Sequence, residues 1–125
     1  MIRLTCRTAL IVLVAAITLL SVVPPLWRPV TSAPHSIEHL LVFVVTGLAL
    51  AMAYSWRWWL QAAALALFAV AIEAAQLFVP GRHARLSDLA VHLAGAGIGI
   101  AAAHLAAVLS RSARQPDAAP GRAPR

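Results

Sequence analysis

The sequence has little charge of either sign and no lysine. Only 11% of its 125 residues are charged, whereas 62% are hydrophobic. A water-soluble domain of this length needs far more polar surface, so the composition excludes one. The basic residues are all arginines, and most flank apolar runs instead of forming one cluster. Because nucleic-acid-binding proteins gather their basic residues on one face or tail, we expect no nucleic-acid partner.

The chain also has almost no cysteine. Cys6 stands alone, which excludes an internal disulfide and offers no cysteine framework for a metal. It precedes the first apolar run, a position that argues against a lipoprotein-type cleavage site. The histidines show no H-E-x-x-H or comparable spacing. We therefore expect neither a metal ion nor another cofactor.

Long hydrophobic runs are what the sequence does have. They cover residues 8–26, 37–55, 58–79 and 88–109. A membrane-spanning helix needs roughly 20 residues. The sequence therefore predicts an all-α integral membrane four-helix bundle, with one transmembrane domain over residues 1–109. Residues 110–125 are rich in Pro, Ala and Arg and predict a disordered basic tail.

The distribution of arginines predicts the orientation. With a cytoplasmic N-terminus, seven arginines lie inside: Arg3, Arg7, Arg57, Arg111, Arg114, Arg122 and Arg125. Three lie outside: Arg28, Arg82 and Arg85. This asymmetry places both termini and the tail in the cytoplasm, and the tryptophans around Arg57 then form an anchor at the inner interface. A cleaved signal peptide is the alternative for the first run, but prolines follow it where small residues would be expected.

Polar residues converge on the junction between the last two runs. Glu73 and Gln76 lie one turn apart before it, and Asp88 and His92 lie one turn apart after it. Ionisable groups at membrane depth are costly and mark functional sites. The candidate ligand-binding cluster comprises His39, Glu73, Gln76, Arg82, Asp88 and His92. We expect Arg82 or Arg85 to pair with Glu73.

Two of these residues also have purely structural interpretations. Glu73 would then only hold helices together, and Asp88 would only cap the fourth helix, whose positive end favours a carboxylate. Gly95 and Gly99 share a helical face with Asp88 and His92. Because small residues let membrane helices approach closely, we expect this face to pack against the helix at 58–79.

The spacing of these residues resembles the VanZ-like membrane protein family. The matching residues are Glu73, Gln76, Arg82, Asp88, Gly95 and Gly99, together with His39, Phe43 and Gly47 in an earlier helix. The resemblance covers residues 37–105. His92 stands where the family usually has asparagine, and His35 and Ser36 replace an acidic–basic pair.

This resemblance implies a multi-pass protein of the bacterial cell envelope, in the inner (cytoplasmic) membrane. It also implies that Gly47, like Gly95 and Gly99, serves helix packing. The family is named for a founding member linked to resistance to a glycopeptide antibiotic, teicoplanin. Its molecular mechanism is not settled, so the resemblance supplies no reaction.

Three functions fit the sequence, with the lipid bilayer as the common partner. The favoured one is a non-enzymatic module that binds an anionic lipid-linked or cell-wall-related ligand at its outer face, where arginine suits phosphate and carboxylate. The second is a membrane-embedded acid–base enzyme acting on an envelope lipid, with Glu73 or Asp88 as base and His39 or His92 as acid. No nucleophile with an adjacent base is evident, which disfavours an enzyme. The third is a transporter subunit that forms a homo-oligomer around a pore.

Overall fold

The computed structural model describes residues 1–23, 34–81 and 84–113, and this part of the chain is built from helices without a strand. The helices are α1 (Ile2–Val22), α2 (His35–Ala53), α3 (Trp58–Gln76) and α4 (Leu86–Ser112). Each is long and apolar enough to span a bilayer. The predicted all-α membrane four-helix bundle is thereby confirmed.

The helix ends differ from the predicted ones. α1 begins at Ile2 and not at residue 8, because the long arginine side chains of its first turns can reach polar surroundings while the backbone stays helical. α3 ends at Gln76, before residue 79, since Pro80 disfavours helical backbone at the preceding residue and Gly81 adopts a φ of 79°. α4 runs to Ser112, so the predicted tail is helical at its start, and residues 114–125 lie outside the described residues.

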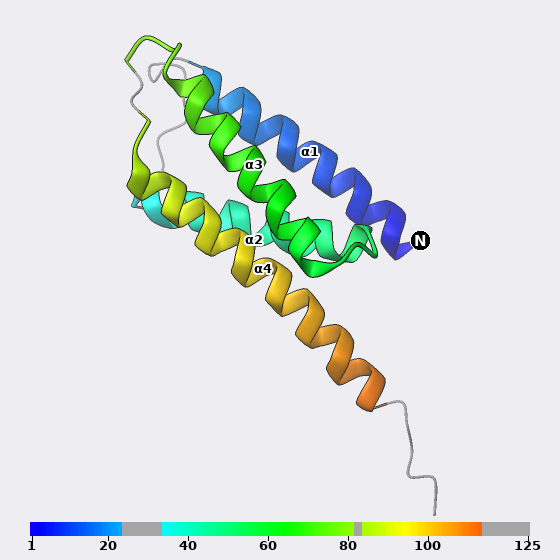
Figure 1. Ribbon diagram of the computed structural model, residues 1–125. Helices are drawn as coiled ribbons and strands as arrows, with labels where there is room; N and C mark the ends of the chain where they lie inside the picture. The colour runs from blue at the N-terminus through cyan, green and yellow to red at the C-terminus, as the bar shows by residue number, and fades with distance from the viewer. Residues whose placement is uncertain (24–33, 82–83, 114–125) are drawn as a thin grey trace, which may run out of the picture.

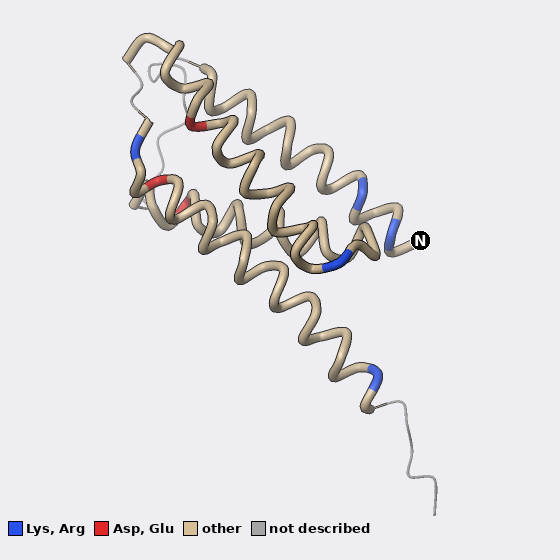
Figure 2. Tube along the Cα trace, in the orientation of Figure 1, with Lys and Arg blue, Asp and Glu red and all other residues tan. Residues whose placement is uncertain are grey.

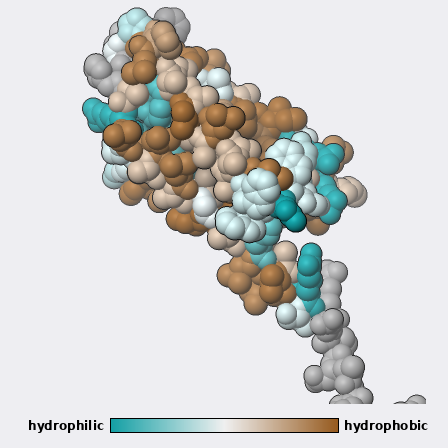
Figure 3. All heavy atoms as spheres, viewed as in Figure 1, coloured by the Kyte–Doolittle hydropathy of each residue, from teal (hydrophilic) through white to brown (hydrophobic). Residues whose placement is uncertain are grey.

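The helices run antiparallel in sequence order (Figure 1). One end of the bundle holds the N-terminus and the α2–α3 turn; we call it the arginine end. The opposite end, where α2 and α4 begin and α3 ends, is called the polar end. Figure 2 shows the described acidic residues at the polar end and most described arginines at the other. On the face shown in Figure 3, the surface between the two ends is mainly hydrophobic, as a lipid-facing surface is.

Glycines bring α2 and α4 into close contact. A Cβ atom on Gly95 would lie 2.5 Å from the main-chain oxygen of Leu40, and one on Gly47 would lie 2.5 Å from that of Ala96. A Cβ on Gly99 would collide with the main-chain oxygen of Val44. The glycine face of α4 therefore packs against α2 and not, as expected from the sequence, against α3. The glycine on α2 completes this contact, and alanine-rich α3 has no glycine to match it.

Gln61 fixes the turn at the arginine end. Its side chain is fully buried, and its Nε2 donates hydrogen bonds to the main-chain oxygens of Tyr54 and Trp56, at 3.1 and 3.2 Å. The Nε2 atom of His104 lies 3.0 Å from its Oε1. One amide thus ties the α2–α3 turn to α4. The sequence analysis gave neither residue a role, since a lone glutamine in a helix carries no signal.

Replacing Gln61 with leucine should lower the free energy of unfolding by about 1–3 kcal/mol, because the main-chain oxygens of Tyr54 and Trp56 lose their donor. Equilibrium unfolding in mixed micelles measures this change. His104→Leu is the matched control: it removes one contact made by an exposed side chain and should cost less. Equal costs would contradict the role given to the amide.

Candidate functional site

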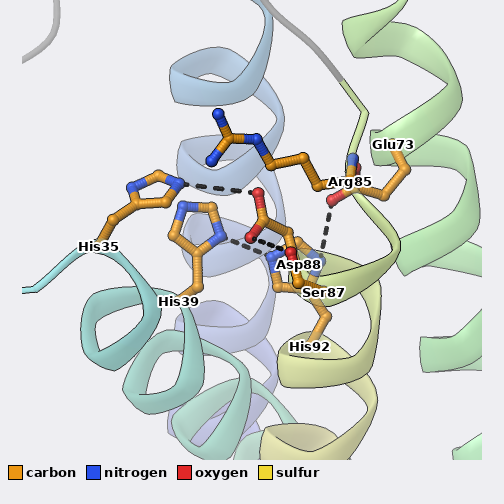
Figure 4. A network of polar contacts seen from close by, with 7 residues as sticks. All are labelled: His35, His39, Glu73, Arg85, Ser87, Asp88 and His92. Carbon is orange, nitrogen blue, oxygen red and sulfur yellow. Dashed lines mark hydrogen bonds and ion pairs between the residues drawn. The ribbon is translucent and has the colours of Figure 1, made fainter.

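Three helices bring polar side chains together at the polar end. His39 comes from the start of α2, Glu73 from the last turns of α3, and Asp88 and His92 from the start of α4. Figure 4 shows these side chains pointing toward one another, with His35 and Ser87 at the margin. Four of the six residues predicted for the cluster therefore lie within one site.

A chain of polar contacts links Glu73, His92 and His39. Glu73 Oε1 lies 3.5 Å from His92 Nδ1, and His92 Nε2 lies 2.5 Å from His39 Nδ1. The side chain of His92 is only 1% exposed and that of Glu73 only 9%. Phe43 stacks on the ring of His92, with centroids 4.2 Å apart. The chain is thus enclosed by protein, where electrostatic interactions are stronger than in water.

The position of Glu73 favours a proton on Nδ1 of His92. A carboxylate accepts hydrogen bonds, so Glu73 favours a proton on the facing Nδ1. In the neutral ring Nε2 then accepts, and His39 Nδ1 donates to it. Glu73 Oε2 also accepts a hydrogen bond of 3.1 Å from the backbone N–H of Arg85. The expected arginine partner thus acts through its main chain, while Arg82 lies outside the described residues.

Asp88 lies in the first turn of α4 without being its N-cap. The cap position is Arg85, which makes no side-chain capping bond. The carboxylate of Asp88 accepts a 3.4 Å hydrogen bond from Ser87 Oγ and lies 4.0 Å from His35 Nε2. The positive end of the helix dipole favours this charge. The capping interpretation is wrong in its position, although the electrostatic part holds.

His35 was missed by the sequence analysis. Its ring lies 4.1 Å from that of His39, centroid to centroid, one turn along α2. A four-residue spacing between two histidines at a helix start was the available signal. Gln76 is buried one turn beyond Glu73 but is not part of the chain that joins Glu73, His92 and His39.

A pocket of about 70 Å³ opens beside this chain, between α1 and α2. Its polar lining is Ser21, Glu38, His39 and His92. Its apolar lining is Ile17, Leu20, Val42 and Phe43. The volume can hold a small polar group or a short alkyl segment. α1, which lies outside residues 37–105 where the resemblance was seen in the sequence, therefore supplies one wall of the site.

Among the described residues, no group of three or more His, Cys, Asp and Glu side chains is arranged to hold a metal ion. The arrangement can accept, donate or relay a proton through the two imidazoles. It can also hydrogen-bond a polar group placed in the pocket.

Comparison with known proteins agrees with the pattern of these residues. The family model described as VanZ/LLP1 matches residues 4–107. No curated protein and no solved structure shows significant similarity to the chain.

Proposed function

Since the chain belongs to the VanZ/LLP1 family, we propose that it is an envelope membrane protein that binds an anionic, lipid-linked ligand in the pocket between α1 and α2. The ligand would be a lipid headgroup or a lipid-linked cell-wall precursor. Binding a precursor of this kind would connect the protein to glycopeptide resistance, which acts at the cell wall.

The observation that carries this proposal is the two-sided lining of the pocket. Ser21 and His39 offer hydrogen bonds at its polar side, while Ile17, Leu20 and Val42 form an apolar wall. An amphiphile needs this combination, because its headgroup must be hydrogen-bonded while its chain stays in an apolar medium. Leu20 is partly exposed on the flank of α1, so the apolar wall continues to the lipid-facing surface.

The guanidinium of Arg85, close to the pocket, supports a negative charge on the headgroup, although the carboxylate of Glu38 is part of the pocket lining. Figure 4 shows the guanidinium of Arg85 extending over the site toward His35. Guanidinium suits phosphate and carboxylate because its donors form a planar fork. His39 adds a second donor when it is protonated. The headgroup would then lie between Arg85 and His39.

Filling the pocket should displace the ligand. Ser21→Leu places a larger apolar side chain in the lining, so the purified protein should retain at least about tenfold less of any co-purifying anionic lipid, roughly 1.4 kcal/mol of binding. Mass spectrometry of lipid extracts measures the amount. Thr18→Leu is the matched control, because Thr18 lies on the same helix but is exposed and does not line the pocket.

The lipid content of the two variants decides between specific and general binding. Equal loss from both would point to general lipid exchange on α1. Full retention in Ser21→Leu, with its fold intact by circular dichroism, would contradict the pocket as the binding site. The variant Arg85→Gln tests the charge: it should reduce anionic lipid more than zwitterionic lipid.

We also propose that the arginine end faces the cytoplasm, in the inner membrane. Arg3, Arg7, Arg57 and Arg111 lie at this end, and the positive-inside rule favours that side. The neighbouring Trp56 and Trp58 are exposed, as interfacial anchors are. The polar end and its pocket would then face outward.

Reporter fusions test this orientation. A fusion after Arg114 should report a cytoplasmic location, and an insertion at Gly81 an external one. Because both reporters are placed in the same chain, the signal of each one controls for the expression of the other. An external tail would reverse the orientation and place the pocket on the inner side.

A second candidate function is acid–base catalysis on an envelope lipid, favoured by the contacts of Glu73 with His92 and of His92 with His39. A carboxylate behind an imidazole orients the ring and stabilises its protonated form. Here the effect would pass to His39 at the pocket. Incubating the purified protein with membrane lipids tests this function: a product that appears with the wild type and not with Glu73→Gln would favour the enzyme.

A further inference from the structure

We propose that the arginine end of the bundle binds the phosphate group of an anionic phospholipid from the surrounding leaflet, through Arg7 and Arg57 with Arg3 at the margin. This site lies at the opposite end of the molecule from the polar residues that line the pocket between α1 and α2. It goes beyond the proposed ligand of that pocket and does not depend on it. In the orientation proposed above, the leaflet concerned is the cytoplasmic one.

The first observation is that two arginines continue the side of α1 that faces the bundle. The buried and half-buried residues of α1 include, at helical spacing, Leu10, Val14, Ile17 and Ser21. Continued toward the start of the helix, the same spacing reaches Arg7 and then Arg3. Arginines that only anchored a helix end to the membrane surface could lie on any face. These two lie on the face directed toward the other helices.

Tyr54 holds the guanidinium of Arg7 in place. The Cζ atom of Arg7 lies 5.0 Å from the centroid of the Tyr54 ring, which is a cation–π contact. The ring of Trp56 lies 5.0 Å from that of Tyr54, centroid to centroid. An aromatic ring covers a face of a guanidinium, whereas the N–H donors lie in the guanidinium plane. The contact therefore orients the donors of Arg7 and leaves them able to bind an anion.

The α2–α3 turn brings a second cation to the same place. Arg57 is the N-cap residue of α3 and directly follows Trp56. The hydrogen bonds from Gln61 to the main-chain oxygens of Tyr54 and Trp56 fix the backbone of this turn. A phosphate bound between Arg7 and Arg57 would thus find the backbone already ordered, which lowers the cost of binding.

The described residues hold no carboxylate that could balance these arginines. The described acidic residues, Glu38, Glu73 and Asp88, all lie at the polar end (Figure 2). Like charges at one end of a molecule repel each other, and an anion between them removes this cost. Guanidinium suits phosphate because its donors form a planar fork. The charge of the arginine end therefore favours a phosphate-bearing partner.

Exposed apolar and aromatic side chains around the arginines favour a lipid over a soluble anion. Ile2 and Leu4 of α1 are 71% and 70% exposed, and Trp58 of α3 is 65% exposed. Exposed tryptophans lie at the depth of the lipid headgroups. A phospholipid at this depth could bind the arginines through its phosphate while its acyl chains cover the apolar side chains. Because Arg7 and Arg57 are exposed, we expect this lipid to exchange with detergent during purification.

Lipid titration tests the proposal in the Ser21→Leu background, where the pocket is filled and contributes no binding. Native mass spectrometry in detergent should show that short-chain phosphatidylglycerol binds at least about tenfold more tightly than phosphatidylcholine of the same chain length. Arg7→Gln and Arg57→Gln should each weaken the binding of phosphatidylglycerol at least about threefold, and together at least about tenfold. Soluble glycerol phosphate at the same concentration should not displace the lipid.

Two further substitutions separate the site from net charge. Tyr54→Leu removes the ring beside Arg7 without changing the charge and should weaken binding as Arg7→Gln does, whereas Tyr54→Phe keeps the ring and should bind normally. Arg111→Gln is the charge-matched control. His104 marks the level of the α2–α3 turn through its contact with Gln61, and Arg111 lies about two turns further along α4. Its replacement should leave binding unchanged.

Circular dichroism establishes that each variant is folded. Equal affinity for the two headgroups, or unchanged phosphatidylglycerol binding in the double arginine variant, would overturn the proposal. An equal loss in Arg111→Gln would assign the effect to net charge, and displacement by glycerol phosphate would assign it to a soluble anion; either result would also overturn it. Binding that appears only after Asp117→Asn would make the tail of the chain the occupant and would overturn the lipid as the partner.

Discussion

Gly99→Ala is expected to lower the free energy of unfolding of the bundle by about 1–3 kcal/mol. A single added methyl group meets the main-chain oxygen of Val44 and approaches the backbone nitrogen of Leu48. Backbone atoms of a packed helix cannot turn aside as a flexible side chain does, so α2 and α4 must separate. The loss should appear in the thermal unfolding of the detergent-solubilised protein. Gly95→Ala should behave similarly, since its Cβ meets the main-chain oxygen of Leu40.

Gly97→Ala is the internal control for this prediction. Gly97 lies on the same helix between the other two glycines, and a Cβ there meets nothing within 4 Å. Alanine has a higher helix propensity than glycine by about 1 kcal/mol, so this variant should be neutral or more stable. If the three variants lost stability equally, the close approach of α2 and α4 at Gly95 and Gly99 would be refuted.

The second large effect is expected at the contact between Glu73 and His92. His92→Leu leaves a buried carboxylate oxygen facing an apolar side chain and should cost about 1–3 kcal/mol. Glu73→Leu leaves a buried imidazole facing an apolar side chain. The double variant replaces both with apolar groups, so its loss should be smaller than the sum of the single losses by about 0.5–3 kcal/mol. Equilibrium unfolding of the four proteins yields this coupling energy.

The matched comparison pairs His92→Leu with Gln61→Leu. Gln61 lies at the opposite end of the bundle, so the two losses should add to within about 0.5 kcal/mol. If the losses in free energy of unfolding of Glu73→Leu and His92→Leu also added up in the double variant, the 3.5 Å contact would contribute nothing to folding. The sequence analysis expected the coupling partner to be Arg82 or Arg85. Among the described residues, the Glu73 carboxylate contacts His92 and the backbone N–H of Arg85, while Arg82 lies outside the described residues.

Much of the fold followed from the sequence because the bilayer imposes it. An apolar run near 20 residues has few alternatives to a spanning helix, since backbone polar groups find no water in the bilayer. The same argument identified Glu73, Asp88 and His92, whose polarity conflicts with their surroundings. These residues could be recognised because they are polar within otherwise apolar segments.

The partners of these residues were harder to predict. The small-residue face of α4 was visible, but α2 and α3 were both able to receive it. The contacts of Gly95, Gly99 and Gly47 decide for α2, and these contacts depend on how the helices cross. His35 and Gln61 were missed for another reason: each is an ordinary polar residue near a helix end. The importance of Gln61 comes from the α2–α3 turn, which sequence spacing alone does not place beside it. His35 lies one turn from His39, a spacing that the sequence does show.

The close pairing of α2 and α4 divides the site into a fixed part and an adjustable part. His39 and His92 both belong to this pair, so their separation is set by the helix contact at Gly95 and Gly99. The wall formed by Ile17 and Leu20 belongs to α1, which packs outside that contact. A sideways displacement of α1 would therefore widen the entrance of the pocket from the lipid, while the distance between the imidazoles of His39 and His92 would stay the same. The polar contacts therefore depend on α2 and α4, whereas the entry of a ligand from the lipid depends on α1.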